Sequence, residues 1–228
     1  MKVELIHNTP LWVASKAIRK CWASEDKSDT FIYDVSCDPD DIGETYKQGE
    51  IVCGTKDKAL IDRVGNKNKH KSTLEHLVYT FDIDGISRAC LQEVARHRMA
   101  SYSVKSTRYT LKELRDEEYF SNDSGVEPNF FNYCIDVSPD INQANANALD
   151  NILYYLESGK ELTNDKLKYL LPEAYKTSLV MTINARSLQN FLELRSSKEA
   201  LWEIRDLANA MYQELPDEHK YLFKDFML

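Results

Sequence analysis

Glycine and proline are scarce in this sequence, whose 228 residues include only 7 Gly and 6 Pro. Linker-rich and low-complexity chains are enriched in these residue types, so the composition argues against that class. A chain of this length can bury a hydrophobic core without disulfide bonds or a structural metal ion. We therefore expect one folded domain over residues 1–228.

The cysteines follow no disulfide or metal-binding pattern. They are odd in number and scattered, without a Cys-x-x-Cys pair: Cys21, Cys37, Cys53, Cys90 and Cys134. This spacing fits neither a zinc site nor a disulfide framework. We expect no metal ion and a reducing, cytoplasmic location.

Long apolar runs and excess positive charge are also missing. No stretch approaches the roughly 18 apolar residues of a membrane-spanning helix, and the N-terminus lacks the features of a signal peptide. The formal net charge of -8 would repel a polyanion over most of the surface. The sequence therefore predicts neither a membrane nor a nucleic-acid partner, and any anion site must be local.

Apolar periodicity predicts a helix-rich α+β fold, with a mixed or antiparallel sheet from the first half of the chain and helices from the second. Strands are expected at Val3–Ile6 and Leu77–Ile83, the latter ended by Gly85, with the polar stretch Asp26–Gly54 as loop. Helical patterns cover Leu11–Trp22, Ile86–Arg98, a segment starting at Ser138-Pro139, Leu167–Tyr175, Leu188–Leu192 and Leu201–Met211. A Ser-x-x-Glu capping box at Ser72 is expected to start a short helix or turn, and a second one at Ser196 is expected to precede the last long helix.

One segment concentrates basic side chains. Residues 96–112 contain no acidic residue, but they hold Arg96, His97, Arg98, Lys105, Arg108 and Lys112. Such a cluster repels itself unless an anion binds in it, and the planar arginine side chain binds phosphate through paired hydrogen bonds. A solvated basic strand or turn is the alternative explanation.

Three blocks of this chain resemble the flavin-dependent thymidylate synthase family. Arg96-His97-Arg98, followed after seven residues by Ser106 and Arg108, is similar to the family signature. The blocks Ser72–His76 and Asn184–Arg195 are also similar to family segments and occur in the right order. The resemblance implies the fold of that family and the reductive methylation of dUMP to dTMP. It also implies 5,10-methylenetetrahydrofolate as carbon donor, FAD as cofactor, NADPH as reductant and tetrahydrofolate as product.

The resemblance assigns roles residue by residue. The implied FAD-binding residues are Ser72, Glu75, Arg96, His97, Arg98, Asn184, Arg186 and Asn190. The implied dUMP-binding residues are Gln92, Glu93, Arg96, Ser106, Thr107, Arg108, Lys168 and Arg195. Family members are homotetramers with active sites built across subunit interfaces, so the same assembly is expected here.

Arg195 resembles the family's arginine at the uracil ring, and it is the main catalytic candidate because a fixed cation there would stabilise developing negative charge. Its alternative role is to neutralise the dipole at the end of a helix. Ser106 is a second candidate, as a nucleophile, although no adjacent base activates its hydroxyl. No cysteine lies in a motif that would lower its pKa, so we expect no cysteine nucleophile.

The sequence departs from the common family pattern at three places. Ser103-Val104 stands where many members carry an Asn-Glu pair, and Lys168 stands where an arginine is usual. Three residues before Arg96, where a Gln is frequent, this chain has Glu93, directly after Gln92. The lysine at position 168 keeps the charge but loses the bidentate geometry. Two other classes stay open, a nucleotide- or RNA-binding module and a flavoprotein reductase without methyl transfer. A flavin spectrum and dTMP formation would distinguish them.

Overall fold

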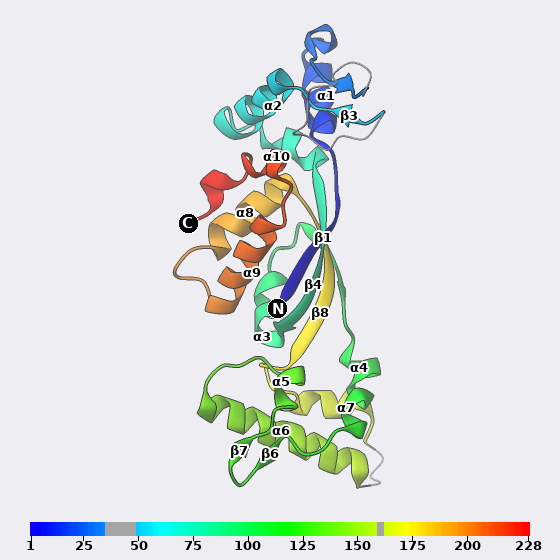
Figure 1. The fold of residues 1–228 in the computed structure, drawn as a ribbon, viewed down its shortest axis with the longest axis vertical. Helices are drawn as coiled ribbons and strands as arrows, with labels where there is room; N and C mark the ends of the chain where they lie inside the picture. Colours follow the sequence, from blue (N-terminus) through cyan, green and yellow to red (C-terminus); the bar gives the residue numbers. More distant parts are fainter. Residues whose placement is uncertain (35–48, 159–161) are drawn as a thin grey trace.

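The structure, a computed structural model, describes residues 1–34, 49–158 and 162–228 (Figure 1). The strands are β1 (Lys2–Asn8), β2 (Phe31–Ile32), β3 (Ile51–Val52), β4 (Val78–Ser87), β5 (Ala100–Val104), β6 (Ser121–Asn122), β7 (Gly125–Val126) and β8 (Lys176–Asn184). The α-helices are α1 (Leu11–Cys21), α2 (Thr55–Ile61), α3 (Arg88–Val94), α4 (Thr107–Thr110), α5 (Phe130–Tyr133), α6 (Pro139–Glu157), α7 (Asn164–Leu167), α8 (Ala185–Arg195), α9 (Trp202–Gln213) and α10 (Asp217–Lys220). Short 3-10 or π turns cover Glu25–Lys27, Asp62–Lys67, Lys71–His76, Leu111–Asp116, Lys168–Leu170 and Lys224–Phe226.

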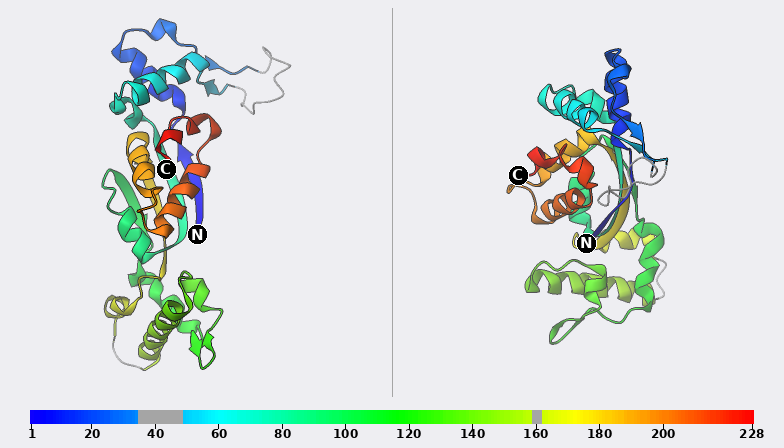
Figure 2. Two further views of the ribbon diagram at one scale, coloured as in Figure 1. Left: turned by 90° about the vertical axis from the view of Figure 1, so that its left-hand side faces the viewer. Right: turned by 45° about the horizontal axis from the view of Figure 1, so that its top comes forward.

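A four-stranded antiparallel sheet in the order β1-β4-β8-β5 forms the middle of an elongated molecule (Figure 1). Alternate residues of β8 are buried, because successive side chains of a strand point to opposite faces. The buried face packs against α3, α8 and α9, which lie on one side of the sheet in the views of Figures 1 and 2. The β8 side chains that alternate with the buried ones are only half-buried.

Two hydrophobic cores hold the chain together. The larger core joins the sheet to α1, α3, α8 and α9 and includes the fully buried Tyr79, Phe81 and Phe191. The smaller core lies around α6 and includes Phe120 and Phe130. Strands β5 and β8 connect the two regions, so they set the position of one core relative to the other (Figure 1).

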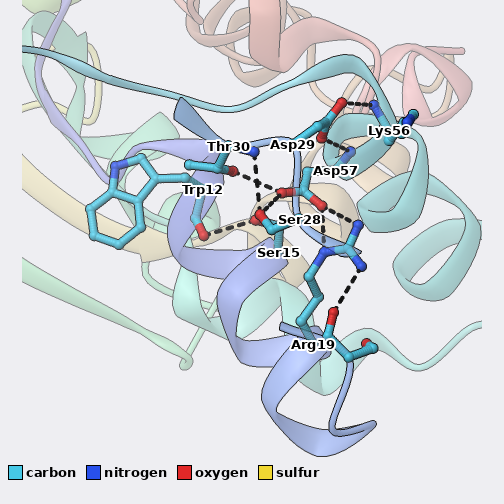
Figure 3. A network of polar contacts seen from close by, with 9 residues as sticks. Trp12, Ser15, Arg19, Ser28, Asp29, Thr30, Lys56 and Asp57 are labelled. Carbon is cyan, nitrogen blue, oxygen red and sulfur yellow. Dashed lines mark hydrogen bonds and ion pairs between the residues drawn. The ribbon is translucent and has the colours of Figure 1, made fainter. Parts of the chain in front are cut away.

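A buried polar network joins α1, α2 and residues 28–30 (Figure 3). The Asp57 carboxylate of α2 accepts hydrogen bonds from Arg19 Nε of α1 at 2.5 Å, from Ser28 Oγ at 2.5 Å and from Thr30 Oγ1 at 2.8 Å. Asp29 accepts from the backbone N–H groups of Lys56 and Asp57 at the start of α2. A buried charge requires this degree of pairing, and the network therefore fixes residues 28–30 onto α1 and α2.

The α+β class is confirmed, with an antiparallel sheet and many helices. The placement of strands in the first half was incomplete, because the central strand β8 comes from the second half. The expected end of a strand at Gly85 was wrong. Gly85 has a φ of 76° at a register shift in β4, so the glycine accommodates a bulge and the strand continues to Ser87.

Several helix expectations also need correction. Helix α3 begins at Arg88 and ends at Val94, because β4 takes the residues before it. The stripe Leu167–Tyr175 is not one helix, since Pro172 disfavours a helical conformation at Leu171 and the chain then enters β8. Within Asp26–Gly54, the short strands β2 and β3 interrupt the expected loop, and residues 35–48, including Cys37, lie outside the described residues.

Neither capping box caps an α-helix. The short helix or turn expected near Ser72 is present as the 3-10 helix Lys71–His76, but Ser72 lies inside it without capping it, and Glu75 pairs with Arg186. Ser196 is the C-cap of α8, whereas α9 starts at Trp202. The expected helix start at Ser138-Pro139 is confirmed, with Pro139 in the first turn of α6. Among the described helices, none combines the length and apolarity needed to cross a membrane.

Candidate functional site

A cavity of about 630 Å³ lies where β8 leads into α8, beside the turn that precedes β4 and the segment that precedes β5. Its walls come from four segments: Glu75, residues 96–99, the start of α8 and the end of α8. We call it the arginine cavity, because its lining includes Arg96, Arg98, Arg186 and Arg195. Against these four cations stands the single carboxylate of Glu75, which gives the lining a formal charge of +3 when His97 is neutral. The cavity therefore suits an anionic ligand.

The start of α8 presents three polar side chains to the arginine cavity. Asn184 is the N-cap residue, and its Oδ1 accepts the backbone N–H of Ser187 at 2.9 Å. Arg186 Nη1 lies 2.6 Å from Glu75 Oε1, which joins α8 to the turn before β4. Asn190 follows Arg186 by four residues and lies on the same face of the helix. The helix thus holds these side chains in a fixed relation.

Arg195 closes the far end of the arginine cavity and contacts two other candidates. Its Nε donates to His97 Nε2 at 2.9 Å, its Nη1 to Glu93 Oε2 at 2.7 Å and its Nη2 to the Glu93 carbonyl oxygen at 3.2 Å. The last bond satisfies a carbonyl near the end of α3 that lacks an intrahelical partner. Arg195 is only 15% exposed, so these contacts set its orientation.

The neutral form of His97 accepts the hydrogen bond from Arg195 at Nε2. Burial, followed by the nearby charge of Arg195, lowers the pKa of His97 from 6.5 to about 4. The ring packs edge-on against Phe191 of α8, with centroids 4.7 Å apart. Tyr102 of β5 donates to the carbonyl oxygens of Val94 and His97, which fastens the turn between α3 and β5. The Arg96–Arg98 turn is therefore held from both sides.

A second cleft of about 510 Å³ shares Arg195 with the first. We call it the glutamate cleft, because Glu93, Glu173 and Glu199 line it together with Gln92 and Arg195. Three carboxylates and one guanidinium give this lining a formal charge of -2. Gln92 Nε2 donates a hydrogen bond to Glu173 Oε2 at 2.8 Å. Arg195 thus separates a positive cavity from a negative cleft.

Four other candidates lie at the opposite end of β5. Three of them follow the strand: Ser106, which is the N-cap residue of α4, Thr107 and Arg108. We call these three residues the α4 corner. Arg108 Nε pairs with Asp165 Oδ1 of α7 at 2.9 Å, and Asn164 Nδ2 donates to the Arg108 carbonyl oxygen. Lys168 directly follows α7, which packs against α4. Residues Ala100 to Val104 span about 14 Å in an extended strand, so the corner lies well away from Arg195.

Seven of the implied FAD-binding residues line the arginine cavity, and Ser72 does not. The lining adds three residues that sequence reasoning missed: Met99, Ser187 and Leu194. Each lies beside a proposed residue, and the helical spacing of Ser187 and Leu194 with Asn190 and Arg195 could have indicated them. Within the part of the chain that the structure describes, the Ser106 hydroxyl makes no hydrogen bond, so no base lies within hydrogen-bond reach of it.

The described residues contain no group of three or more His, Cys, Asp or Glu side chains arranged to hold a metal ion. Burial raises the pKa of Cys53 to about 11 and the pKa values of Cys90 and Cys134 to about 12. These three thiols are therefore protonated at neutral pH and poor nucleophiles. The chemistry available at the arginine cavity comes from cations, amides and a neutral imidazole.

An antiparallel α+β fold with a cavity lined by arginines is suited to polar, anionic ligands. The family described as thymidylate synthase complementing protein matches residues 4–219, and the chain belongs to this family. It is 53% identical to the flavin-dependent thymidylate synthase of Wolinella succinogenes over 224 residues, which cover 98% of this chain and 97% of that protein. The corresponding enzyme of Campylobacter jejuni is 53% identical over 226 residues, 98% of this chain and 96% of the relative.

A solved structure gives the same result at the level of the fold. The crystal structure of thymidylate synthase X from Helicobacter pylori with FAD and dUMP has a TM-score of 0.83 and 45% identity. The match covers 100% of this chain and 99% of that chain. The family resemblance seen in the sequence is thereby confirmed.

Proposed function

We propose that this chain is a flavin-dependent thymidylate synthase that methylates dUMP to dTMP. The proposed reaction takes its carbon from 5,10-methylenetetrahydrofolate and its electrons from NADPH, and it releases tetrahydrofolate. The observation that carries the proposal is the meeting of Arg96, His97, Arg98, Asn184, Arg186, Asn190 and Arg195 around one cavity. Relatives of the same length carry this activity in their names, which supports it.

The arginine cavity fits FAD by the chemistry of its donors. The guanidinium groups of Arg96, Arg98 and Arg186 would hold the diphosphate, and the amides of Asn184 and Asn190 would bond to polar ring or sugar atoms. Bound there, FAD would supply the redox chemistry of the reaction. The protein residues orient the reactants, and Glu75 fixes Arg186 for this purpose.

At the other end of the nucleotide, we propose that Ser106, Thr107, Arg108 and Lys168 bind the dUMP phosphate. Two cations and two hydroxyl groups match a phosphate dianion, and α7 brings Lys168 next to the α4 corner. The uracil end of dUMP would be bound by Gln92, Glu93, Arg96 and Arg195. Arg195 would stabilise negative charge on the uracil ring during methyl transfer.

We propose a homotetramer in which neighbouring chains complete each site. This assembly is supported by the position of the α4 corner, which β5 separates from Arg195 within one chain. Apolar side chains stand exposed beside the corner, with Tyr109 at 70% and Tyr169 at 85%. The chain would act as one domain in the cytoplasm, where its described cysteines, all free, stay reduced.

The test combines flavin binding with turnover. Quenching of FAD fluorescence by the purified protein, bleaching on addition of NADPH, and dTMP formation from dUMP and the folate are expected. Arg186→Ala should weaken FAD binding, whereas Arg115→Ala, an exposed arginine outside the lining, should not. A protein that neither quenches FAD nor forms dTMP would refute the proposal. Flavin binding without dTMP formation would instead support the reductase alternative.

A further inference from the structure

Arg195 has limited capacity left for a ligand. A guanidinium has five N–H groups, and three of those of Arg195 are used by His97 and Glu93. One N–H on each terminal nitrogen remains. Both partners are held in place: Glu93 stands in the last turn of α3, and His97 packs on Phe191. The two remaining N–H groups therefore point in fixed directions.

Glu93 also adds negative charge directly beside the Arg195 guanidinium. Its carboxylate lies 2.7 Å from Arg195 Nη1 and 3.7 Å from Arg96 Nη1, so it serves both arginines. With Arg195 only 15% and Glu93 31% exposed, solvent screens this pair less than a surface ion pair. Glu173 and Glu199 add two further negative charges to the same cleft.

Because Arg195 is already paired with a carboxylate, its remaining N–H groups bind neutral and anionic ligands with different strengths. A neutral carbonyl oxygen can still accept the remaining N–H groups, because it brings no charge. A phosphate dianion would meet the repulsion of Glu93 at close range and that of the other two carboxylates farther away. At the α4 corner the charge balance is the opposite, because the cations Arg108 and nearby Lys168 outnumber the carboxylate of Asp165.

We propose that Glu93 restricts Arg195 to neutral hydrogen-bond acceptors, so that a nucleotide approaches this arginine with its ring and not with its phosphate. The direction of the nucleotide rests on the proposed function, whereas the exclusion of phosphate from Arg195 follows from the ion pair alone. Glu93 is thus a positioning and specificity-determining residue that acts through Arg195.

The test measures anion binding at Arg195 without any nucleotide. In the R108A background, which weakens phosphate binding at the α4 corner, inorganic phosphate is titrated calorimetrically into R108A and R108A/E93Q. The second variant should bind phosphate at least about fivefold more tightly, because the amide keeps the size of the side chain but removes its charge. The gain should disappear in R108A/E93Q/R195A. R108A/E199Q is the matched control, since Glu199 lines the same cleft but contacts Ser197, and its affinity should stay within about twofold of R108A.

Equal phosphate affinity in R108A and R108A/E93Q would overturn the proposal, as would a gain that survives removal of Arg195. If E93Q perturbs folding, as judged by circular dichroism, E93A supplies the test, because it removes the same charge and should give the same gain in phosphate affinity. A turnover assay distinguishes failure of the proposed function from failure of the role proposed for Glu93. A wild-type chain that forms no dTMP refutes the proposed function, while the phosphate titration still decides the role of Glu93. In an active enzyme, E93Q should become more sensitive to inhibition by inorganic phosphate.

Discussion

Two substitutions at opposite ends of β5 test whether neighbouring chains share a site. Arg108→Ala removes a cation from the α4 corner, and Arg195→Ala removes the cation between the arginine cavity and the glutamate cleft. Each variant alone should be nearly inactive, since each lacks one end of the proposed dUMP site. Arg195→Ala should still bind FAD, because all seven residues of the proposed FAD set that line the cavity remain.

The expected magnitude follows from counting chains. If one chain supplies Arg108 and another supplies Arg195, an equal mixture of the two variants assembles sites in four combinations. One combination contains both intact arginines, so about one quarter of the sites should be active after subunit exchange. If a single chain supplied both residues, every site would lack one of them, and no mixing could restore activity.

The assay measures dTMP formation before and after the two variants are unfolded together and refolded. Native mass spectrometry, with one variant carrying a mass label, confirms that subunits have exchanged. Variants refolded separately serve as controls for losses during refolding. Exchanged tetramers with no more activity than the separate variants would refute the shared site.

Other predictions concern stability and the thiols. Asp57→Ala should lower the free energy of unfolding by about 3 to 5 kcal/mol in urea titrations, because it leaves the Arg19 charge buried without a partner; a loss under about 1 kcal/mol would contradict the role given to this network. Burial of His219, followed by the effect of Lys58, lowers its pKa from 6.5 to about 4, so the folded protein binds fewer protons than the unfolded chain between these values. Stability should therefore fall as the pH drops from 6.5 to 4, and His219→Gln should reduce this dependence, with His97 supplying the remainder; an unchanged slope would exclude His219 as a source. A folded variant with all five cysteines replaced by Ser or Ala should keep dTMP formation, and loss of turnover with ligand binding intact would reveal an essential thiol.

The local patterns of this sequence predicted much of the fold. The α1 periodicity and the Ser138-Pro139 start of α6 were correct, because caps and amphipathic spacing act over a few residues. Strand β8 was missed, although Thr177, Leu179, Met181 and Ile183 alternate with half-buried residues. The apolar residues just before it suggested a helix, and only the pairing with β4 and β5 distinguishes the two states.

The candidate residues were predicted by motif, but their grouping was not. Arg98 and Ser106 stand close in sequence, yet the extended strand between them carries Ser106 away from the arginine cavity. The contact of Glu93 with Arg195 joins residues 102 positions apart. Such a contact depends on how α3 and α8 pack on the sheet, and no local pattern specifies it. Glu75 illustrates the same limit, since its pairing with Arg186 replaced the expected cap.

Strand β5 limits how the length of this protein can vary. All five of its residues pair with β8, from Ala100 opposite Ile183 to Val104 opposite Leu179. Inserting one residue would turn every later side chain of the strand to the other face, whereas inserting two would restore the faces but move the α4 corner by about 7 Å. The hairpin of β6 and β7, which lies at the margin of the smaller core, has no such coupling to the arginine cavity. Natural or engineered insertions should therefore be accepted near Asp123 and rejected between Met99 and Ser106.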